Sequence, residues 1–200
     1  MLRPCDGLSG SPKRVLVAGT SGSGKTTVAR SLAEILGVPH VEIDELFHGP
    51  NWRPNPDFVA AVESFSSREA WITEWQYGSV RPLLAARADL LVWLDYPRAL
   101  VMSQVVRRTI RRRIRREVLW NGNVEPPLRT IVSNREHIIR WAWRTHRKTA
   151  QAVEELVRAR PGLPVVRLAN RAEAEEWLTG LSDKHAGRVH VVRCGRDSSD

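Results

Sequence analysis

The chain has 200 residues, of which 42% are hydrophobic, and this length and composition predict one domain with a substantial hydrophobic core. Its formal net charge of +9 comes mostly from arginine and indicates anionic partners: nucleotides, nucleic acid or an acidic membrane. The two cysteines, Cys5 and Cys194, form no C-x-x-C pair, which argues against a zinc site or a disulfide framework. No apolar run approaches the ~20 residues of a membrane span, and the start has no signal-peptide core. We therefore expect a cytoplasmic protein with no membrane partner.

The first predicted elements are a strand and a helix separated by a glycine-rich stretch. Residues 1–12 contain two prolines and two glycines and are predicted to be a flexible leader. A buried strand is expected over 15–18, and a helix runs from near Lys25 to Leu36, where Gly37 ends it.

The stretch between this strand and helix matches the phosphate-binding P-loop (Walker A) pattern G-x-x-x-x-G-K-[ST]. It consists of Gly19, Thr20, Ser21, Gly22, Ser23, Gly24, Lys25, Thr26 and Thr27. Its glycines let backbone N–H groups turn inward around phosphates, and the helix N-terminus adds its positive dipole end. Lys25 is expected to reach the β and γ phosphates of ATP, and the Thr26 hydroxyl to bind Mg²⁺. A chance glycine-rich turn is the alternative, and the flanking strand and helix argue against it.

The rest of the chain alternates strands and helices. The further strands are expected at 38–44, 71–75, 90–94 and 165–168. The further helices are expected at 57–68, 79–87, 97–118, 134–160 and 172–178, and a flexible tail at 181–200. This alternation predicts an α/β fold with a five-stranded parallel sheet flanked by helices, whose ligands gather at the carboxyl ends of the strands. Three of these ends lie beside an acid: Asp44, Glu74 and Asp95.

The helix predicted from Pro97 is amphipathic and rich in arginine. Its apolar stripe consists of Met102, Val106, Ile110, Ile114 and Val118, widened by Val101 and Val105. Its polar side carries Arg107, Arg108, Arg111, Arg112, Arg113, Arg115 and Arg116. These arginines fit a lid that closes over ATP, a face that grips nucleic-acid phosphates, or a plain solvated surface. Arg107 and Arg111 share a face and are our catalytic candidates, although Arg108 and Arg115 fit the geometry equally well.

The chain resembles the nucleoside monophosphate kinase group, which includes adenylate, shikimate and gluconate kinases. The resemblance lies in the P-loop near the N-terminus, the short five-stranded α/β core and the arginine-rich helical segment between the fourth and fifth strands. The nearest resemblance is to the bacterial adenylate kinase-related proteins, often labelled DNA topology modulation proteins. Its motifs match residues 43–47 and 87–95. Residues 71–77 align with the pattern W-x-I-D-G-N-Y, with Thr73, Glu74, Trp75 and Gln76 in place of its isoleucine, aspartate, glycine and asparagine. The resemblance covers 13–180 and implies a P-loop NTPase fold with a small helical, arginine-rich lid at 107–133.

The resemblance also implies roles for individual residues. Asp44 is expected to face the acceptor and hold Mg²⁺ or take a proton, with an N-cap as the alternative. Glu74 is a candidate for a water-mediated Mg²⁺ contact, with a surface carboxylate as the alternative. Arg81 is expected to bind an anionic acceptor or to form a salt bridge. Asn170 and Arg171 lie where the adenine loop of this fold falls.

Together these features predict an ATP- and Mg²⁺-dependent phosphotransferase that moves the γ-phosphate of ATP to a small acceptor. The alternative is a nucleotide-gated, nucleic-acid-binding P-loop protein with little kinase activity, which would use the arginine run. Asp95 is expected to cap the helix that Pro97 opens.

Overall fold

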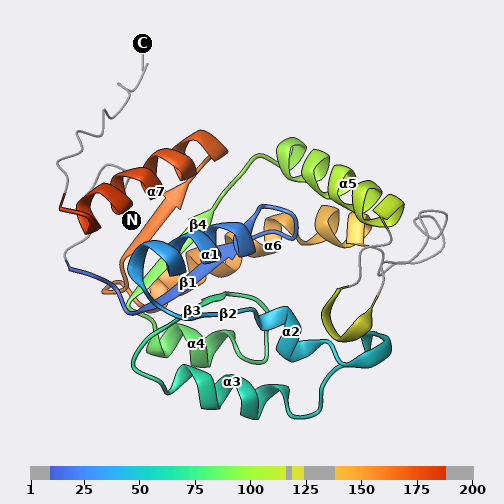
Figure 1. Ribbon diagram of the computed structural model, residues 1–200, viewed down its shortest axis with the longest axis horizontal. Helices are drawn as coiled ribbons and strands as arrows, with labels where there is room; N and C mark the ends of the chain where they lie inside the picture. Colours follow the sequence, from blue (N-terminus) through green and yellow to red (C-terminus); the bar gives the residue numbers. More distant parts are fainter. Residues whose placement is uncertain (1–9, 116–118, 124–137, 188–200) are drawn as a thin grey trace.

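A five-stranded sheet forms the centre of the computed structural model, which describes residues 10–115, 119–123 and 138–187 (Figure 1). The strands are β1 Arg14–Gly19, β2 His40–Val41, β3 Trp71–Glu74, β4 Leu90–Leu94 and β5 Val165–Leu168. Their order is β2-β3-β1-β4-β5, and every neighbouring pair is parallel. The predicted α/β fold with a five-stranded parallel sheet is confirmed. The predicted leader, lid and tail lie partly outside the described residues.

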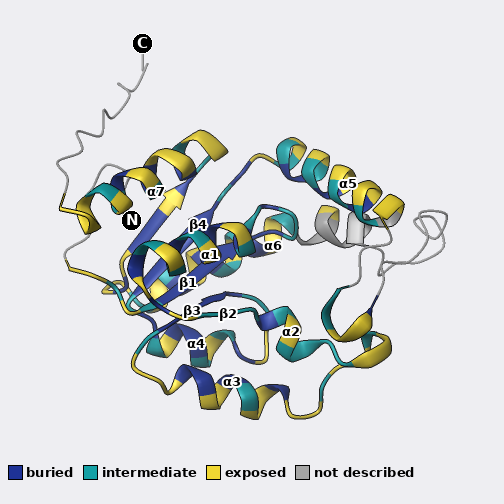
Figure 2. Ribbon diagram, viewed as in Figure 1, coloured by how far each residue is buried: buried dark blue, intermediate teal, exposed yellow. Residues whose placement is uncertain are grey.

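Helices cover both faces of the sheet. One face packs against α1 Lys25–Leu36 and α7 Arg171–His185, and the other against α3 Phe58–Ser66, α4 Arg81–Arg87 and α6 Ile138–Ala159. Central β1 shows why: Val15 and Val17 point to the first face, Leu16 and Ala18 to the second, and all four are fully buried. Figure 2 shows the buried sheet between helices whose outer surfaces are exposed.

The remaining elements lie at the carboxyl ends of the strands or beyond them. They are α2 Ile43–Phe47, η1 Pro50–Trp52, α5 Arg98–Arg115 and η2 Trp120–Gly122. Among the described helices, none is both long enough and apolar enough to cross a membrane.

The second strand is shorter than predicted. The expected strand over 38–44 contains only β2, and the chain then leaves the sheet to form α2, which includes Asp44. The carboxylate of Glu74 accepts a hydrogen bond from the backbone N of Ile43, the first residue of α2, at 3.2 Å. The last helix is longer than predicted, since α7 continues to His185.

Most of the apolar stripe of α5 lies outside the core. Val101 and Val105 are 1% and 0% exposed, whereas Ile110 is 40% and Ile114 is 77% exposed. Only the first turns of α5 lie against the sheet and α1, and the helix then extends away from them (Figure 1). The stripe that begins at Met102 therefore remains mostly outside the core.

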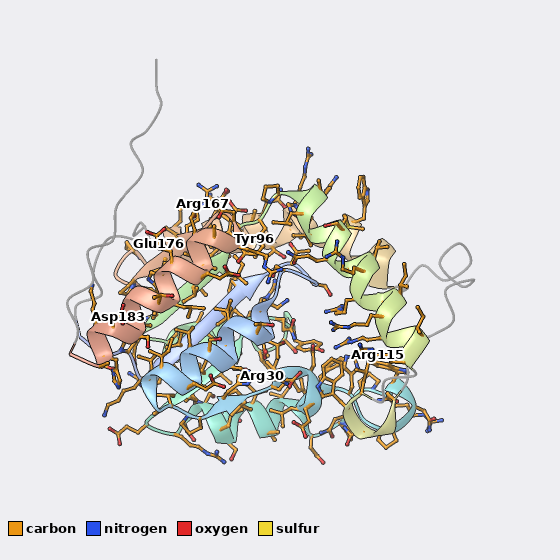
Figure 3. All side chains as sticks on the ribbon, turned by 45° about the horizontal axis from the view of Figure 1, so that its top comes forward. Arg30, Tyr96, Arg115, Arg167, Glu176 and Asp183 are labelled. Atoms are coloured by element: carbon orange, nitrogen blue, oxygen red, sulfur yellow. The ribbon has the colours of Figure 1, made fainter. Side chains whose placement is uncertain are left out.

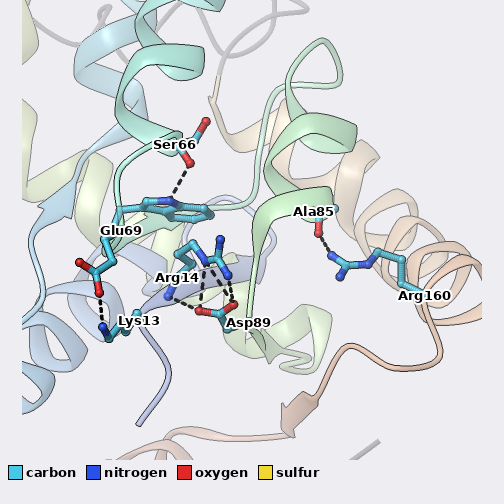
Figure 4. Close-up of polar contacts among 8 residues, drawn as sticks. Lys13, Arg14, Ser66, Glu69, Ala85, Asp89 and Arg160 are labelled. Atoms are coloured by element: carbon cyan, nitrogen blue, oxygen red, sulfur yellow. Dashed lines mark hydrogen bonds and ion pairs between the residues drawn. The ribbon is translucent and has the colours of Figure 1, made fainter.

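Ion pairs join the ends of the elements. The guanidinium of Arg14 in β1 donates to the carboxylate of Asp89 at 2.7 Å, and the Arg14 backbone N donates to it at 3.0 Å (Figure 4). Burial alone would raise the pKa of Asp89, but the hydrogen bonds from Arg14 bring it below its ordinary value. Asp95, the predicted helix cap, instead accepts a hydrogen bond from Arg167 Nε at 2.8 Å.

We expect Asp89→Asn to lower the free energy of unfolding by about 1 kcal/mol at neutral pH, because the Arg14 pair is partly exposed. A folded-state pKa below the ordinary value stabilises the protein above the ordinary pKa. This stabilisation is lost as the pH falls through the folded pKa, so wild type and variant should converge in acid. Urea denaturation at several pH values measures this.

Glu69→Gln is the matched control, because Glu69 forms a fully solvent-exposed pair with Lys13 and should not change the urea midpoint. Equal midpoints for the two variants at neutral pH would contradict the role of Asp89.

Candidate active site

The P-loop connects β1 to α1 and has the backbone conformation that its glycines allow. Gly22 has a φ of +88° and Gly24, the N-cap of α1, has a φ of +94°. A Cβ atom at Gly22 would lie 2.1 Å from Cγ2 of Val105, so α5 approaches the loop too closely for any side chain there. The loop thus requires glycine at Gly22 for both conformation and space.

Lys25 is a buried cation in this loop. It is 8% exposed, and its Nζ donates to the carbonyl of Thr20 at 3.3 Å. No carboxylate of the described residues forms an ion pair with it, and burial lowers its pKa, although the charges of Asp44 and Glu74 oppose this. A buried cation without an ion pair is unfavourable until an anion arrives, so the loop fits a phosphate ligand.

Two hydroxyl groups of the loop also lack protein partners. The Oγ atom of Ser23 is buried and forms no hydrogen bond with any described residue. Thr26, in the first turn of α1, is half-buried, and its hydroxyl has no partner in the described part of the chain. Thr27 is exposed. The described residues contain no group of three acidic, histidine or cysteine ligands for a metal. The Mg²⁺ contact of Thr26 stays a prediction.

The two carboxylate oxygens of Asp44 differ in their hydrogen bonds to the described residues. Its Oδ1 accepts hydrogen bonds from Gln76 Nε2 and from the Tyr77 hydroxyl, each at 2.6 Å. Its Oδ2 has no hydrogen bond among the described residues. Burial raises the pKa of Asp44, while the Tyr77 hydrogen bond and the charge of Lys25 oppose this rise. The N-cap alternative is wrong, because Glu42 is the N-cap of α2.

Glu74 is 1% exposed, so the surface-carboxylate alternative is wrong. Its Oε1 lies 3.2 Å from Nε2 of His40, and its Oε2 accepts from the backbone N of Ile43 at 3.2 Å. Burial alone would raise the pKa of Glu74, but the hydrogen bond and charge of His40 and the N–H of Ile43 bring it below the ordinary value. Glu74 thus fixes the backbone directly before Asp44, and its Mg²⁺ contact stays a prediction.

Arg81, the first residue of α4, lies over the ring of Trp75, 4.9 Å from its centroid. Its Nε is buried without a hydrogen-bond partner, and no described carboxylate pairs with it, so the salt-bridge alternative is wrong among these residues. Burial lowers its pKa, and its charge lowers the pKa of Lys25. Trp75, which replaces the glycine of the motif, therefore supports a cation near the P-loop.

The arginines of α5 divide between two faces of the helix. Arg107 and Arg111 share a face, as predicted, but that face is exposed and lines an open groove on the outside of α5. Arg108 is half-buried, lies one turn beyond Val105, which contacts Gly22, and lowers the pKa of Lys25 by its charge. The structure therefore brings Arg108, rather than Arg107 or Arg111, towards the P-loop.

Figure 3 shows how far α5 extends: Tyr96 lies beside the core before the helix, and Arg115 lies at its far end. Arg116 lies outside the described residues, as does most of the predicted lid after α5.

The predicted adenine-loop residues already have protein partners. The Asn170 side chain is the N-cap of α7: its Oδ1 accepts from the backbone N of Glu173 at 2.9 Å, and its Nδ2 donates to the Glu173 carboxylate at 2.7 Å. Arg171 is exposed and pairs with Glu175 at 3.8 Å. Their loop follows β5, at the same edge of the sheet as the P-loop. A contact with adenine stays a prediction.

Three residues around Asp44 were not assigned roles from the sequence: His48, Gln76 and Tyr77. Gln76 and Tyr77 occupy the last two positions of the W-x-I-D-G-N-Y stretch, so the signal was present without a function attached to it. His48 follows α2, and its Nε2 lies 3.3 Å from the Tyr77 hydroxyl.

Comparison with solved structures finds similar folds. Shikimate kinase from Acinetobacter baumannii in complex with shikimate has a TM-score of 0.52 and 18% identity over 88% of this chain and 93% of that chain. A gluconokinase from Sinorhizobium meliloti 1021 has a TM-score of 0.45 and 22% identity over 90% and 99% of the two chains. No protein-family model and no curated protein matches the sequence. The first likeness shows that this chain shares the fold of that shikimate kinase.

Proposed function

We propose that this protein is an ATP- and Mg²⁺-dependent phosphotransferase that acts on a small acceptor with a hydroxyl group and an anionic group. The observation that carries the proposal is the buried Lys25 of the P-loop, which has no ion pair among the described residues and lies in one charge cluster with Asp44. A phosphate ligand would give Lys25 an anionic partner, and an acceptor hydroxyl would donate a hydrogen bond to Asp44. The similarity of the fold to shikimate kinase supports this class of reaction.

In the proposed reaction, the acceptor hydroxyl oxygen forms a bond to the γ-phosphorus of ATP. The bond from that phosphorus to the β–γ bridging oxygen breaks, and ADP leaves with the electron pair. The hydroxyl proton passes to Oδ2 of Asp44, the oxygen without a hydrogen bond to any described residue. The raised pKa of Asp44 suits it to accept this proton.

The remaining groups bind and stabilise charge. The P-loop N–H groups and Lys25 would hold the phosphates, and Arg108 would neutralise charge on the transferring phosphoryl group. Mg²⁺, held by Thr26 and phosphate oxygens, would supply further charge neutralisation. Arg81, whose Nε has no described partner, would bind the anionic group of the acceptor.

The motif resemblance to adenylate kinase-related proteins makes a nucleotide one candidate among anionic acceptors.

Lys25→Met is expected to weaken Mg-ATP binding at least tenfold, because the loop loses its buried cation, and isothermal titration calorimetry measures this. The same change should not lower the unfolding midpoint of the nucleotide-free protein, because it removes a buried charge without an ion pair. Lys13→Ala, at an exposed lysine, is the control. Unchanged ATP affinity in Lys25→Met would contradict the phosphate site.

Asp44→Asn is expected to reduce phosphoryl transfer by about 10²–10⁴-fold, the range for loss of a general base, while ATP affinity stays at the wild-type value. ATP consumption against a panel of hydroxylated, anionic metabolites and nucleoside monophosphates measures this. Glu45→Gln, at the exposed neighbour on α2, should retain full turnover. Full turnover in both variants would leave Asp44 only a structural role.

Arg108→Ala is expected to lower kcat at least tenfold with a smaller effect on ATP affinity, since its charge acts mainly on the transferring group. Arg107→Ala, on the exposed face, is the matched comparison and should change kcat less than twofold. The reverse ranking would support the original candidates, Arg107 and Arg111. No effect of any arginine on turnover, together with salt-resistant duplex binding, would favour the nucleic-acid alternative.

A further inference from the structure

A chain of two hydrogen bonds and one ring stack connects Asp44 to a segment that lies far from it in sequence. The Tyr77 hydroxyl contacts Oδ1 of Asp44 at 2.6 Å and Nε2 of His48 at 3.3 Å. The His48 ring stacks on Trp120 at a centroid distance of 5.8 Å and an interplanar angle of 21°. This contact chain joins α2, the loop after β3 and the η2 turn.

The direction of these hydrogen bonds follows from the protons available. Burial and the nearby charge of Asp44 raise the pKa of Tyr77, so its hydroxyl keeps its single proton. That proton lies towards the carboxylate at 2.6 Å, so the Tyr77 oxygen must accept from His48. Burial lowers the pKa of His48, although the charge of Asp44 opposes this. A neutral ring with its proton on Nε2 fits this hydrogen bond and leaves Nδ1, which has no hydrogen bond among the described residues, as the acceptor.

The backbone at Tyr77 is strained in order to place this hydroxyl. Its φ is +60°, in the left-handed region that an aromatic residue rarely adopts. The ring stacks on Phe47 at 4.0 Å and meets Phe58 edge-on at 5.2 Å. The Tyr77 carbonyl accepts from the backbone N of Val80 and of Arg81, each at 3.1 Å. Contacts on both sides of the residue thus maintain a conformation that it would not adopt alone.

Residues 119–123 hold the other end of the chain. Trp120 Nε1 donates to Glu42 at 2.9 Å, and Asn121 Nδ2 donates to the carbonyl of His48 at 2.5 Å. Asn123 donates to the carbonyl of Gly49 at 3.0 Å and accepts from a backbone N of η1 at 2.9 Å. The segment therefore contacts both the ring and the backbone of His48.

We propose that Tyr77 is a positioning residue that holds Asp44 for proton transfer, and that residues 119–123 hold Tyr77 through His48. The proposal rests on the proposed function, because it assumes that Asp44 faces the acceptor. With Oδ1 fixed by Tyr77 and Gln76, Oδ2 has one direction in which to meet the acceptor hydroxyl. Tyr77 touches the acid rather than the substrate, so its effect appears in kcat.

Tyr77→Phe removes the hydroxyl and keeps the stacked ring. We expect it to lower kcat at least tenfold, with little change in ATP affinity or in the KM of the acceptor. The acid limb of the pH–rate profile should move to higher pH, because the Tyr77 hydrogen bond lowers the pKa of Asp44. The other titratable groups that act on the pKa of Asp44, namely Lys25, Glu74 and His48, are unchanged in this variant.

Tyr96→Phe makes the same chemical change at a buried tyrosine whose hydroxyl has no described hydrogen bond, and should keep wild-type kcat. A Tyr77→Phe variant with wild-type kcat and an unmoved acid limb would overturn the proposal.

His48 provides the second test. His48→Gln keeps a donor at the position of Nε2, and His48→Phe keeps only the stack on Trp120. We expect His48→Gln to retain more of the wild-type kcat than His48→Phe. The double variant Tyr77→Phe with His48→Phe should be no slower than Tyr77→Phe alone, because His48 acts through the Tyr77 hydroxyl. Multiplicative losses in the double variant would remove His48 from the proposal.

A readout without turnover separates this proposal from the proposed function. In protein with ¹³C-labelled aspartate, the Asp44 carboxyl signal, identified by its loss in Asp44→Asn, is titrated with and without the Tyr77 hydroxyl. A higher Asp44 pKa in Tyr77→Phe supports the hydrogen-bond network, and an unchanged titration overturns it. Wild-type protein that transfers phosphate to no acceptor, with a normal network in this titration, would instead overturn the proposed function.

Discussion

The burial of the Lys25 ammonium group is the constraint on which the rest of the site depends. A cation that is 8% exposed loses most of its hydration, and the carbonyl of Thr20 replaces only part of it. The acids Asp44 and Glu74 act on it by charge without forming an ion pair. The loop glycines allow both this burial and the approach of α5 to Gly22. The glycines, the acids and α5 therefore prepare one place for an anion.

Two acids in the same cluster acquire opposite pKa shifts because their hydrogen-bond partners differ. Glu74 is the more buried, yet His40 and the N–H of Ile43 keep its pKa below the ordinary value. Asp44 receives its hydrogen bonds on one oxygen only, and burial raises its pKa. A carboxylate that stays charged suits structural support, and one with a raised pKa suits proton transfer. Environment, rather than residue type, thus separates the two roles.

The sequence predicted the sheet and the P-loop because their signals are local. A β-branched apolar run, glycines at fixed spacing and a lysine occur within 13 residues of one another, from Val15 to Thr27. The face of α5 was not predicted, because two adjacent apolar stripes begin at Val101 and Met102, and the sequence does not show where the core ends. The roles of Gln76 and Tyr77 depend on contacts 32 and 33 residues away, which leave no periodic signal.

Strained backbone conformations occur around His48 and Tyr77, residues whose roles the sequence did not predict. Among the described residues, the non-glycine positions with positive φ are Asn51, Trp52, Tyr77 and Asn121. Trp52, Tyr77 and Asn121 contact His48, and Asn51 directly precedes Trp52 in η1. Each such conformation destabilises the folded state by about 1–3 kcal/mol, and a typical hydrogen bond stabilises it by about 1 kcal/mol. No single contact offsets the strain at these positions. The position of Asp44 therefore depends on many weak contacts that act together across α2, the loop after β3 and η2.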